Sequence, residues 1–373
     1  MKITYYISFI FLSFLWSCST PIEVDYIYPE DQIKIIKNVE YKTVPNIDNI
    51  LGIWETEFNK KNDGSFAKVI KNIAKSSLDV NWLKYKHLDF DVYIPDDNLD
   101  NRPLIIFIHG GGFLYGNKDD DLPKTFCMEF ARRGYVCASI DYRTMNFLTP
   151  SFVKAGYVAT QDALSAFKYF NEHADDYGID RYKIVIAGVS AGAVTALNAA
   201  FLGNDEEIVG RHEKLDEMYG VLRESDFPDV LPAAVVNISG AVFGLNILND
   251  NIPVISIHGN NDEILPNTHG LPFDQTSKKY NNLIDKAKSY LSSTSPEIQN
   301  IINPELDEAK MFEVYGSQDI DAVLAKNDIY SEFIRIEGKY SGHSLVLSQN
   351  GTLKKDGVLI IDKISNFLYG VLK

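Results

Sequence analysis

One stretch of the sequence, residues 183–192, constrains the fold more than any other. Its apolar, β-branched residues predict a buried strand that runs into the pentapeptide Gly188-x-Ser190-x-Gly192. The alanine-rich residues 191–202 then predict a helix, and Gly203 stands where that helix would end. A serine between strand and helix occupies a tight turn, in which a Cβ at either flanking glycine would meet the neighbouring strand or helix. The pattern therefore predicts a serine hydroxyl that projects from the carboxyl edge of a sheet; a structural glycine-rich turn is the alternative.

The rest of the sequence alternates strand and helix patterns. Residues 104–108 form a continuous apolar run, typical of a strand buried on both faces of a sheet. Residues 153–173 carry alanine and phenylalanine at helical spacing, which predicts an amphipathic helix. This alternation predicts an α/β fold with a mostly parallel sheet and helices on both faces. Further strands are expected at residues 39–44, 90–95, 135–140, 234–239, 254–257 and 333–338, and further helices at residues 122–133 and 357–371.

We expect one folded domain behind a short leader. Residues 1–17 predict a signal peptide, and residues 18–45 predict a tether and a first strand. Residues 46–373 are expected to form a single domain, because no repeat or low-complexity linker divides them. Insertions into this domain are predicted near residues 46–84, 204–230 and 274–311.

The first residues predict export. Lys2 precedes a hydrophobic stretch, Ile3 to Trp16, that is too short to span a bilayer. Cys18 follows, and this junction resembles the lipobox of bacterial lipoproteins, although Trp16 stands where that motif usually has a small residue. The resemblance implies a lipid on Cys18 that anchors the protein to the cell envelope of a bacterium, in the periplasm or at the outer membrane. An ordinary signal peptide and an uncleaved anchor are the alternatives.

The net charge and the cysteine content limit the binding partners, disulfides and metal sites that the sequence predicts. The net charge of −15, with no basic cluster, argues against nucleic acid or an anionic membrane surface as a partner bound through charge. Cys127 and Cys137 fall in a predicted helix and a predicted strand, where we expect buried free thiols, with a disulfide as the alternative. No cluster of histidine and cysteine has metal-ligand spacing, so neither a metal nor another cofactor is predicted. Nothing in the pattern predicts an oligomeric state.

A serine hydroxyl can attack a carbonyl only with a base to take its proton and an acid to orient that base. Among the seven histidines, His343 is the candidate base, because it lies in a glycine-flanked loop after the last predicted strand. Asp262, which follows the preceding strand, is the candidate acid, with Glu263 as the fallback. An Asx turn or a loop cap is the structural alternative for Asp262. His258, close to its own strand, is expected to be a structural partner.

A second glycine-rich segment, His109-Gly110-Gly111-Gly112, follows the apolar run 104–108. Consecutive glycines let backbone N–H groups converge on a substrate oxygen without obstruction by side chains. We expect His109 to fix this loop through hydrogen bonds. An ordinary turn and a phosphate-binding loop are the alternatives, but a phosphate loop would continue with lysine and Ser/Thr, where this sequence has Phe113.

Seven segments carry a family resemblance, in family order: His109–Phe113, Asp141–Arg143, Tyr177–Asp180, Gly188–Gly192, His258–Asp262, Tyr315–Ser317 and Gly342–His343. Together they resemble the HGGG-bearing carboxylesterases and lipases of the α/β-hydrolase superfamily, close to the hormone-sensitive-lipase-like and feruloyl or acetyl-xylan esterase-like groups. The resemblance implies the α/β-hydrolase fold, with Ser190 as nucleophile, Asp262 as acid and His343 as base, in that chain order. It also implies an oxyanion hole made by the N–H groups of Gly111, Gly112 and Ala191.

The expected function is a serine carboxylic-ester hydrolase that works through an acyl-enzyme on small or carbohydrate-linked acyl esters. A serine peptidase of the prolyl-oligopeptidase type shares the order of the triad, but such enzymes usually carry a propeller domain, and no blade-length repeat is present. A non-catalytic binding lipoprotein with the same fold is the second alternative. The complete set of serine, aspartate, histidine and glycine loop argues against it.

Overall fold

A computed structural model describes residues 28–45, 85–113, 115–144, 152–201, 230–272, 313–343, 354–355 and 358–373. The predicted signal peptide, Cys18, and the insertions at 46–84 and 274–311 lie outside these ranges, as does the insertion at 204–230 apart from its last residue. These expectations, and the single-domain organisation, therefore stay predictions.

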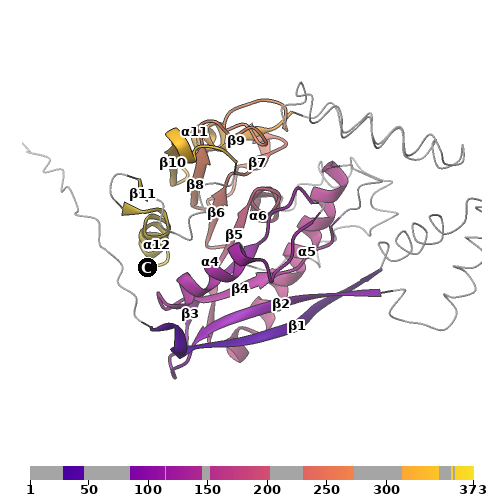
Figure 1. Ribbon diagram of the computed structural model, residues 1–373, viewed down its shortest axis with the longest axis vertical. Coiled ribbons are helices and arrows are strands. Elements are labelled where there is room, and N and C mark those ends of the chain that lie inside the picture. The colour runs from indigo at the N-terminus through magenta and orange to yellow at the C-terminus, as the bar shows by residue number, and fades with distance from the viewer. Residues whose placement is uncertain are drawn as a thin grey trace, which may run out of the picture.

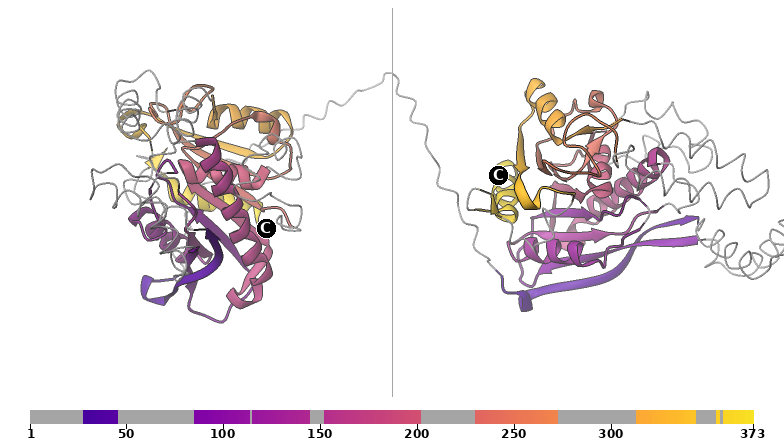
Figure 2. Two further views of the ribbon diagram at one scale, coloured as in Figure 1. Left: turned by 90° about the vertical axis from the view of Figure 1, so that its right-hand side faces the viewer. Right: turned by 45° about the horizontal axis from the view of Figure 1, so that its top comes forward.

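The fold is built on an eight-stranded sheet (Figure 1) with the strand order β1-β2-β4-β3-β5-β6-β8-β10. The six strands from β4 to β10 in this order are parallel, while β1 and β2 run antiparallel at one edge. Figure 2 shows this sheet from two further sides. The strands span Ile33–Pro45 (β1), Tyr85–Pro95 (β2), Arg102–Ile108 (β3), Val136–Ile140 (β4), Ile179–Val189 (β5), Ala234–Ile238 (β6), Val254–Gly259 (β8) and Ser331–Ile336 (β10).

Helices cover both faces of the sheet because the central strands are apolar on both sides. In β3, Leu104 and Ile106 face a core that includes α5 (Phe152–Glu172) and α6 (Ala191–Phe201). The alternate residues Ile105 and Phe107 face a second core. Helices α4 (Asp121–Ala131) and α12 (Ile360–Val371) pack on that second side. The predicted α/β class, with a mostly parallel sheet between two helical layers, is confirmed.

Several elements were not predicted. Helix α11 (Ser317–Lys326) precedes β10 and packs on the same face as α5 and α6. Its sequence is mostly polar, and Ile320 and Leu324 supply most of its buried apolar surface, so the helical period is weak. Short strands β7 (Ala241–Val242) and β9 (Tyr315–Gly316) pair with each other, as do β11 (Lys354–Lys355) and β12 (Val358–Leu359).

The cysteine prediction is confirmed. Cys127 on α4 and Cys137 on β4 are buried and free, and their Sγ atoms lie 2.9 Å apart. Among the helices that the structure describes, none combines the length and apolarity that crossing a bilayer requires.

Candidate active site

Ser190 sits in the strained turn between β5 and α6. Its φ of 55° is in the left-handed region, which is costly for a residue with a side chain. A Cβ at Gly188 would lie 2.2 Å from the carbonyl oxygen of Gly192, and one at Gly192 would lie 2.1 Å from the carbonyl oxygen of Ile108. Both glycines are therefore required by close backbone approach, as the sequence predicted. The turn places Ser190 at the carboxyl end of β5.

The structure brings the three predicted side chains together. His343 Nε2 lies 2.7 Å from Ser190 Oγ, and His343 Nδ1 lies 2.9 and 2.8 Å from the two carboxylate oxygens of Asp262. Because an ionised carboxylate only accepts, Nδ1 carries the proton, and Nε2 is left to accept from the serine hydroxyl. Ser190 and His343 are each largely buried, with 7% of the serine and 14% of the histidine side chain exposed.

Asp262 also caps its own turn. Its Oδ1 accepts the backbone N–H groups of Ile264 and Leu265 at 2.9 Å each, so the predicted structural alternative and the acid position coexist in one residue. Burial of this carboxyl opposes its ionisation, but hydrogen bonds from His258 and His343 outweigh burial and hold the pKa of Asp262 below its ordinary value. The fallback acid, Glu263, is exposed at the surface.

Backbone contacts join the loops that carry the acid and the base. A Cβ at Gly259 would lie 2.0 Å from the carbonyl oxygen of Ser341. The N–H of Asn261 donates to this same oxygen at 2.9 Å, and the Asn261 side-chain amide donates to Ser341 Oγ at 2.7 Å. Sequence reasoning missed these contacts; the glycine after the β8 histidine was the one available signal. The joined loops fix Asp262 and His343 relative to each other.

The glycine-rich loop after β3 approaches Ser190 from the other side. Gly111, Gly112 and Phe113 all have positive φ, of 113°, 60° and 63°. Gly112 and Ala191 line the same pocket as Ser190. Gly111 precedes Gly112 and packs tightly, since a Cβ there would lie 1.9 Å from the carbonyl oxygen of Tyr115.

His109 is buried at the base of this loop. Its Nδ1 lies 2.7 Å from the carbonyl oxygen of Gly110, which can only accept, so Nδ1 carries the proton. Burial lowers the pKa of His109 from 6.5 to about 4, and the ring is neutral at pH 7. Tyr142 donates its hydroxyl to the His109 carbonyl at 3.1 Å and stacks on the ring. Asp141 accepts the N–H of Lys118, which fixes the far end of the loop.

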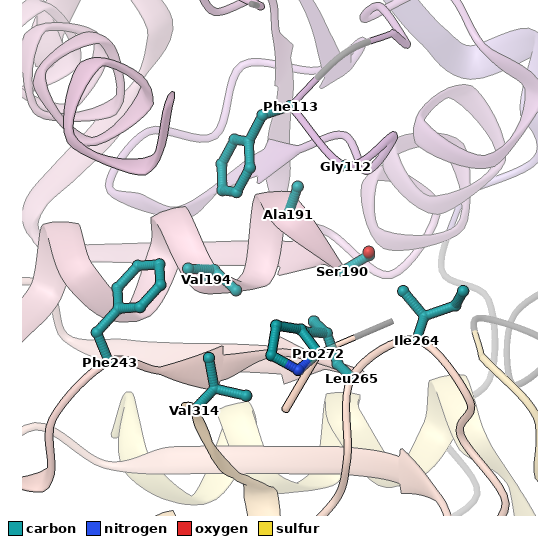
Figure 3. Close-up of a pocket in the computed structure, with 10 residues that line it drawn as sticks. All are labelled: Gly112, Phe113, Ser190, Ala191, Val194, Phe243, Ile264, Leu265, Pro272 and Val314. Carbon is teal, nitrogen blue, oxygen red and sulfur yellow. The ribbon is translucent and has the colours of Figure 1, made fainter. Parts of the chain in front are cut away.

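A small apolar pocket opens beside Ser190 (Figure 3). Of the described residues that line it, only Ser190 has a polar side chain. In Figure 3 the rings of Phe113 and Phe243 lie at the end of the pocket away from the Ser190 hydroxyl. Both rings lie near Gly156 on α5, where an added Cβ would be 3.4 Å from Phe243 and 3.8 Å from Phe113. The remaining lining residues are Gly112, Ala191, Val194, Ile264, Leu265, Pro272 and Val314.

Within the described ranges, no group of three or more histidine, cysteine, aspartate or glutamate residues is placed so that it could hold a metal ion. A polarised serine, an oriented histidine and a glycine loop beside an apolar pocket suit acyl transfer.

Known proteins resemble this chain over part of its length. The family model BD-FAE matches residues 90–242, which is less than half of the 373 residues. The strand order, the turn at Ser190 and this match together decide the fold class. The chain has an α/β-hydrolase fold.

Curated relatives match a shorter region. The acetyl esterases of Salmonella schwarzengrund and Salmonella paratyphi B are 33% and 34% identical to the chain over 109 residues, which is 29% of this chain and 31% of each relative. The match thus spans less than a third of these relatives. Among solved structures, the apo form of Thermogutta terrifontis esterase 2 is 18% identical, with a TM-score of 0.46 over 76% of this chain and 88% of that one.

Proposed function

We propose that the chain is a serine carboxylic-ester hydrolase that works through an acyl-enzyme. The observation that carries this proposal is the 2.7 Å contact between Ser190 Oγ and His343 Nε2, with Asp262 on the opposite ring nitrogen. Partial likeness to the BD-FAE family and to two acetyl esterases supports it. Ester hydrolysis needs no group beyond these side chains, the backbone amides and water.

In the proposed reaction Ser190 Oγ attacks the ester carbonyl while His343 Nε2 takes the hydroxyl proton. Asp262 keeps the ring oriented and stabilises the positive charge that forms on it. His343 then gives the proton to the leaving alcohol, and water repeats the sequence to release the acid. The oxyanion is held by the N–H groups of Gly111, Gly112 and Ala191, of which Ala191 is the first residue of α6.

The pocket supports a short, apolar acyl group as substrate. Among the described residues that line it, Ser190 alone has a polar side chain, and the rings of Phe113 and Phe243 limit its depth. For the alcohol part of the ester we propose a carbohydrate hydroxyl. This choice is in keeping with the predicted lipid anchor at Cys18 and location at the cell envelope.

Hydrolysis of p-nitrophenyl esters from acetate to octanoate by the full-length chain tests the proposal. We expect turnover of the short esters, and a loss of about a thousandfold or more in Ser190→Ala. Labelling by a fluorophosphonate should likewise require Ser190. A wild-type chain that neither turns over esters nor takes the label would be a binding protein, and turnover of peptide anilides alone would make it a peptidase.

A second variant tests the acyl pocket. Phe243→Ala should raise kcat/KM for octanoate relative to acetate by about tenfold, because the removed ring leaves room for several methylenes. Leu99→Ala, which removes an exposed apolar side chain outside the pocket, is the control and should leave the ratio unchanged. An unchanged ratio in Phe243→Ala would mean that the acyl chain lies elsewhere.

A further inference from the structure

His258 contacts the candidate acid from inside the protein. This histidine lies on β8 with its side chain fully buried, and its Nε2 is 3.0 Å from Asp262 Oδ2 and 2.9 Å from the carbonyl oxygen of Leu265. The Asp262 side chain is also fully buried. Asp262 Oδ2 therefore has a histidine on each side, His343 toward the pocket and His258 toward the core.

A chain of buried hydrogen bonds continues from His258 to the centre of the sheet. Its Nδ1 lies 2.8 Å from Ser317 Oγ, at the start of α11. The side-chain amide of Asn237 on β6 donates to Ser317 Oγ at 3.1 Å and to Ser256 Oγ at 2.9 Å. All four of these side chains are buried.

The hydrogens in this series of hydrogen bonds can be assigned from the groups that can only donate or only accept. The Leu265 carbonyl can only accept, so His258 Nε2 carries a proton, and its single N–H is shared between this carbonyl and Asp262 Oδ2. The two N–H hydrogens of Asn237 point to the two serines, so Ser317 accepts from Asn237 and is free to donate its own hydrogen to His258 Nδ1. A Ser317 hydroxyl that donates to Nδ1 corresponds to a neutral imidazole with its proton on Nε2.

We propose that His258 is a positioning residue for the Asp262 carboxylate, held by Ser317 and Asn237 in the neutral tautomer that donates Nε2–H to Oδ2. This inference rests on the proposed esterase function. A neutral donor orients the carboxylate without cancelling its charge, which stays available to the positive ring that forms on His343 during attack. A cationic His258 would share that charge and weaken the base.

Three variants of the full-length chain test this role. In His258→Gln the amide nitrogen can take the place of Nε2 and donate to Asp262, whereas in His258→Asn the shorter amide cannot reach it. Ser317→Ala removes the donor to Nδ1. None of these side chains lines the pocket, so KM should stay within about twofold in all three.

For His258→Asn we expect kcat to fall about 10- to 100-fold, because the acid loses an orienting bond. The acid limb of the kcat/KM profile should also move to higher pH, since an Asp262 without this donor holds the proton of His343 more tightly. The described titratable groups that contact Asp262 are His258 and His343, so no third group confounds the shift. His258→Gln should recover kcat to within about fivefold of wild type, and Ser317→Ala should fall about threefold to tenfold.

Wild-type kcat and an unmoved acid limb in His258→Asn would overturn the inference. Equal losses in the Asn and Gln variants, matched by equal losses of thermal stability, would also overturn it, because His258 would then be a packing residue only. If His258→Asn does not fold, Ser317→Ala decides through the same kcat and KM comparison. A wild-type chain without ester turnover would contradict the proposed function itself, which separates the two failures.

Discussion

Two regions meet at the candidate site, and they are held by different forces. The elbow region, residues 109–113 and 188–192, is positioned by backbone atoms in such close contact that only glycine fits. The acid–base region, residues 258–265, 317 and 338–343, has one such contact, at Gly259, and is positioned in addition by side-chain hydrogen bonds. The candidate nucleophile is thus placed by close backbone contact alone, whereas the candidate acid and base also depend on polar side-chain partners.

The buried titratable groups of the two regions differ in charge. The elbow region contains His109, which burial keeps neutral, and its Nε2 has no partner among the described residues. The acid–base region contains Asp262, which hydrogen bonds from His258 and His343 keep ionised despite burial. Substitutions that change side-chain size should therefore damage the elbow region most, and substitutions that change side-chain charge should damage the acid–base region most.

The largest effect is expected from Asp262→Asn. The amide can still accept from the backbone of its turn, but it offers His343 no negative charge, and its NH₂ group faces the Nε2–H of His258. We expect kcat to fall by about a thousandfold to ten-thousandfold at pH 7, measured with p-nitrophenyl acetate. Glu263→Gln, an equal change of charge on the exposed neighbour, should leave kcat unchanged. Loss of activity in both variants would show that the effect comes from the change in net charge and not from the loss of the carboxylate beside His343.

A methyl group is expected to be nearly as damaging in the elbow region. Gly192→Ala places a Cβ 2.1 Å from the Ile108 carbonyl oxygen, so the turn must shift and Ser190 with it. We expect kcat/KM to fall by about a hundredfold or more and the free energy of unfolding to drop by about 1–3 kcal/mol. In Gly370→Ala, on the exposed end of α12, the new methyl meets nothing within 4 Å, and stability should hold or rise. Full activity in Gly192→Ala would show that close backbone contact at this glycine does not position Ser190, and it would contradict the comparison between the two regions.

The last effect expected is on the pH dependence of stability, and it leaves activity at pH 7 unchanged. The folded-state pKa of His109 is about 4 and its ordinary value is 6.5, so the unfolded chain binds more protons between these values and stability falls as pH falls through that window. The loss should total about 3 kcal/mol. The lowered pKa of Asp262 acts in a separate window: its contribution is present above its ordinary value of 3.8 and is lost only below it.

Urea unfolding at several pH values from 7 down to about 2 can separate these windows. His109→Asn, whose amide can still donate to the Gly110 carbonyl, should flatten the dependence above pH 4 and leave the loss at lower pH. An equal slope in wild type and variant would place the titrating group outside the elbow region.

The elbow region was predictable from sequence because its determinants are local. Ser190 lies between a strand and a helix only a few residues away, and the glycines on either side signal the close approach. Asp262 and His343 were predictable by their place after successive strands of a parallel sheet, since such loops gather at one edge. The glycine-rich loop after β3 was predictable from its consecutive glycines.

The support of the acid–base region was not predictable. The contact between His258 and Ser317 joins residues 59 apart, and that between Asn237 and Ser317 joins residues 80 apart. No periodicity states which buried polar side chains will meet over such separations. Ser317 also begins a helix whose weak apolar pattern hid it. Phe243 escaped notice for the same reason, because a pocket wall is defined by packing across elements.

The distance along the chain between the candidate nucleophile and the candidate base makes their contact depend on one edge of the sheet. Ser190 and His343 are 153 residues apart, and the loop that carries His343 follows β10, which pairs with β8, which pairs in turn with β6. Until β10 docks on β8, Ser190 can have its turn but no partner in His343. In the proposed reaction, turnover that returns during refolding therefore reports completion of this sheet edge.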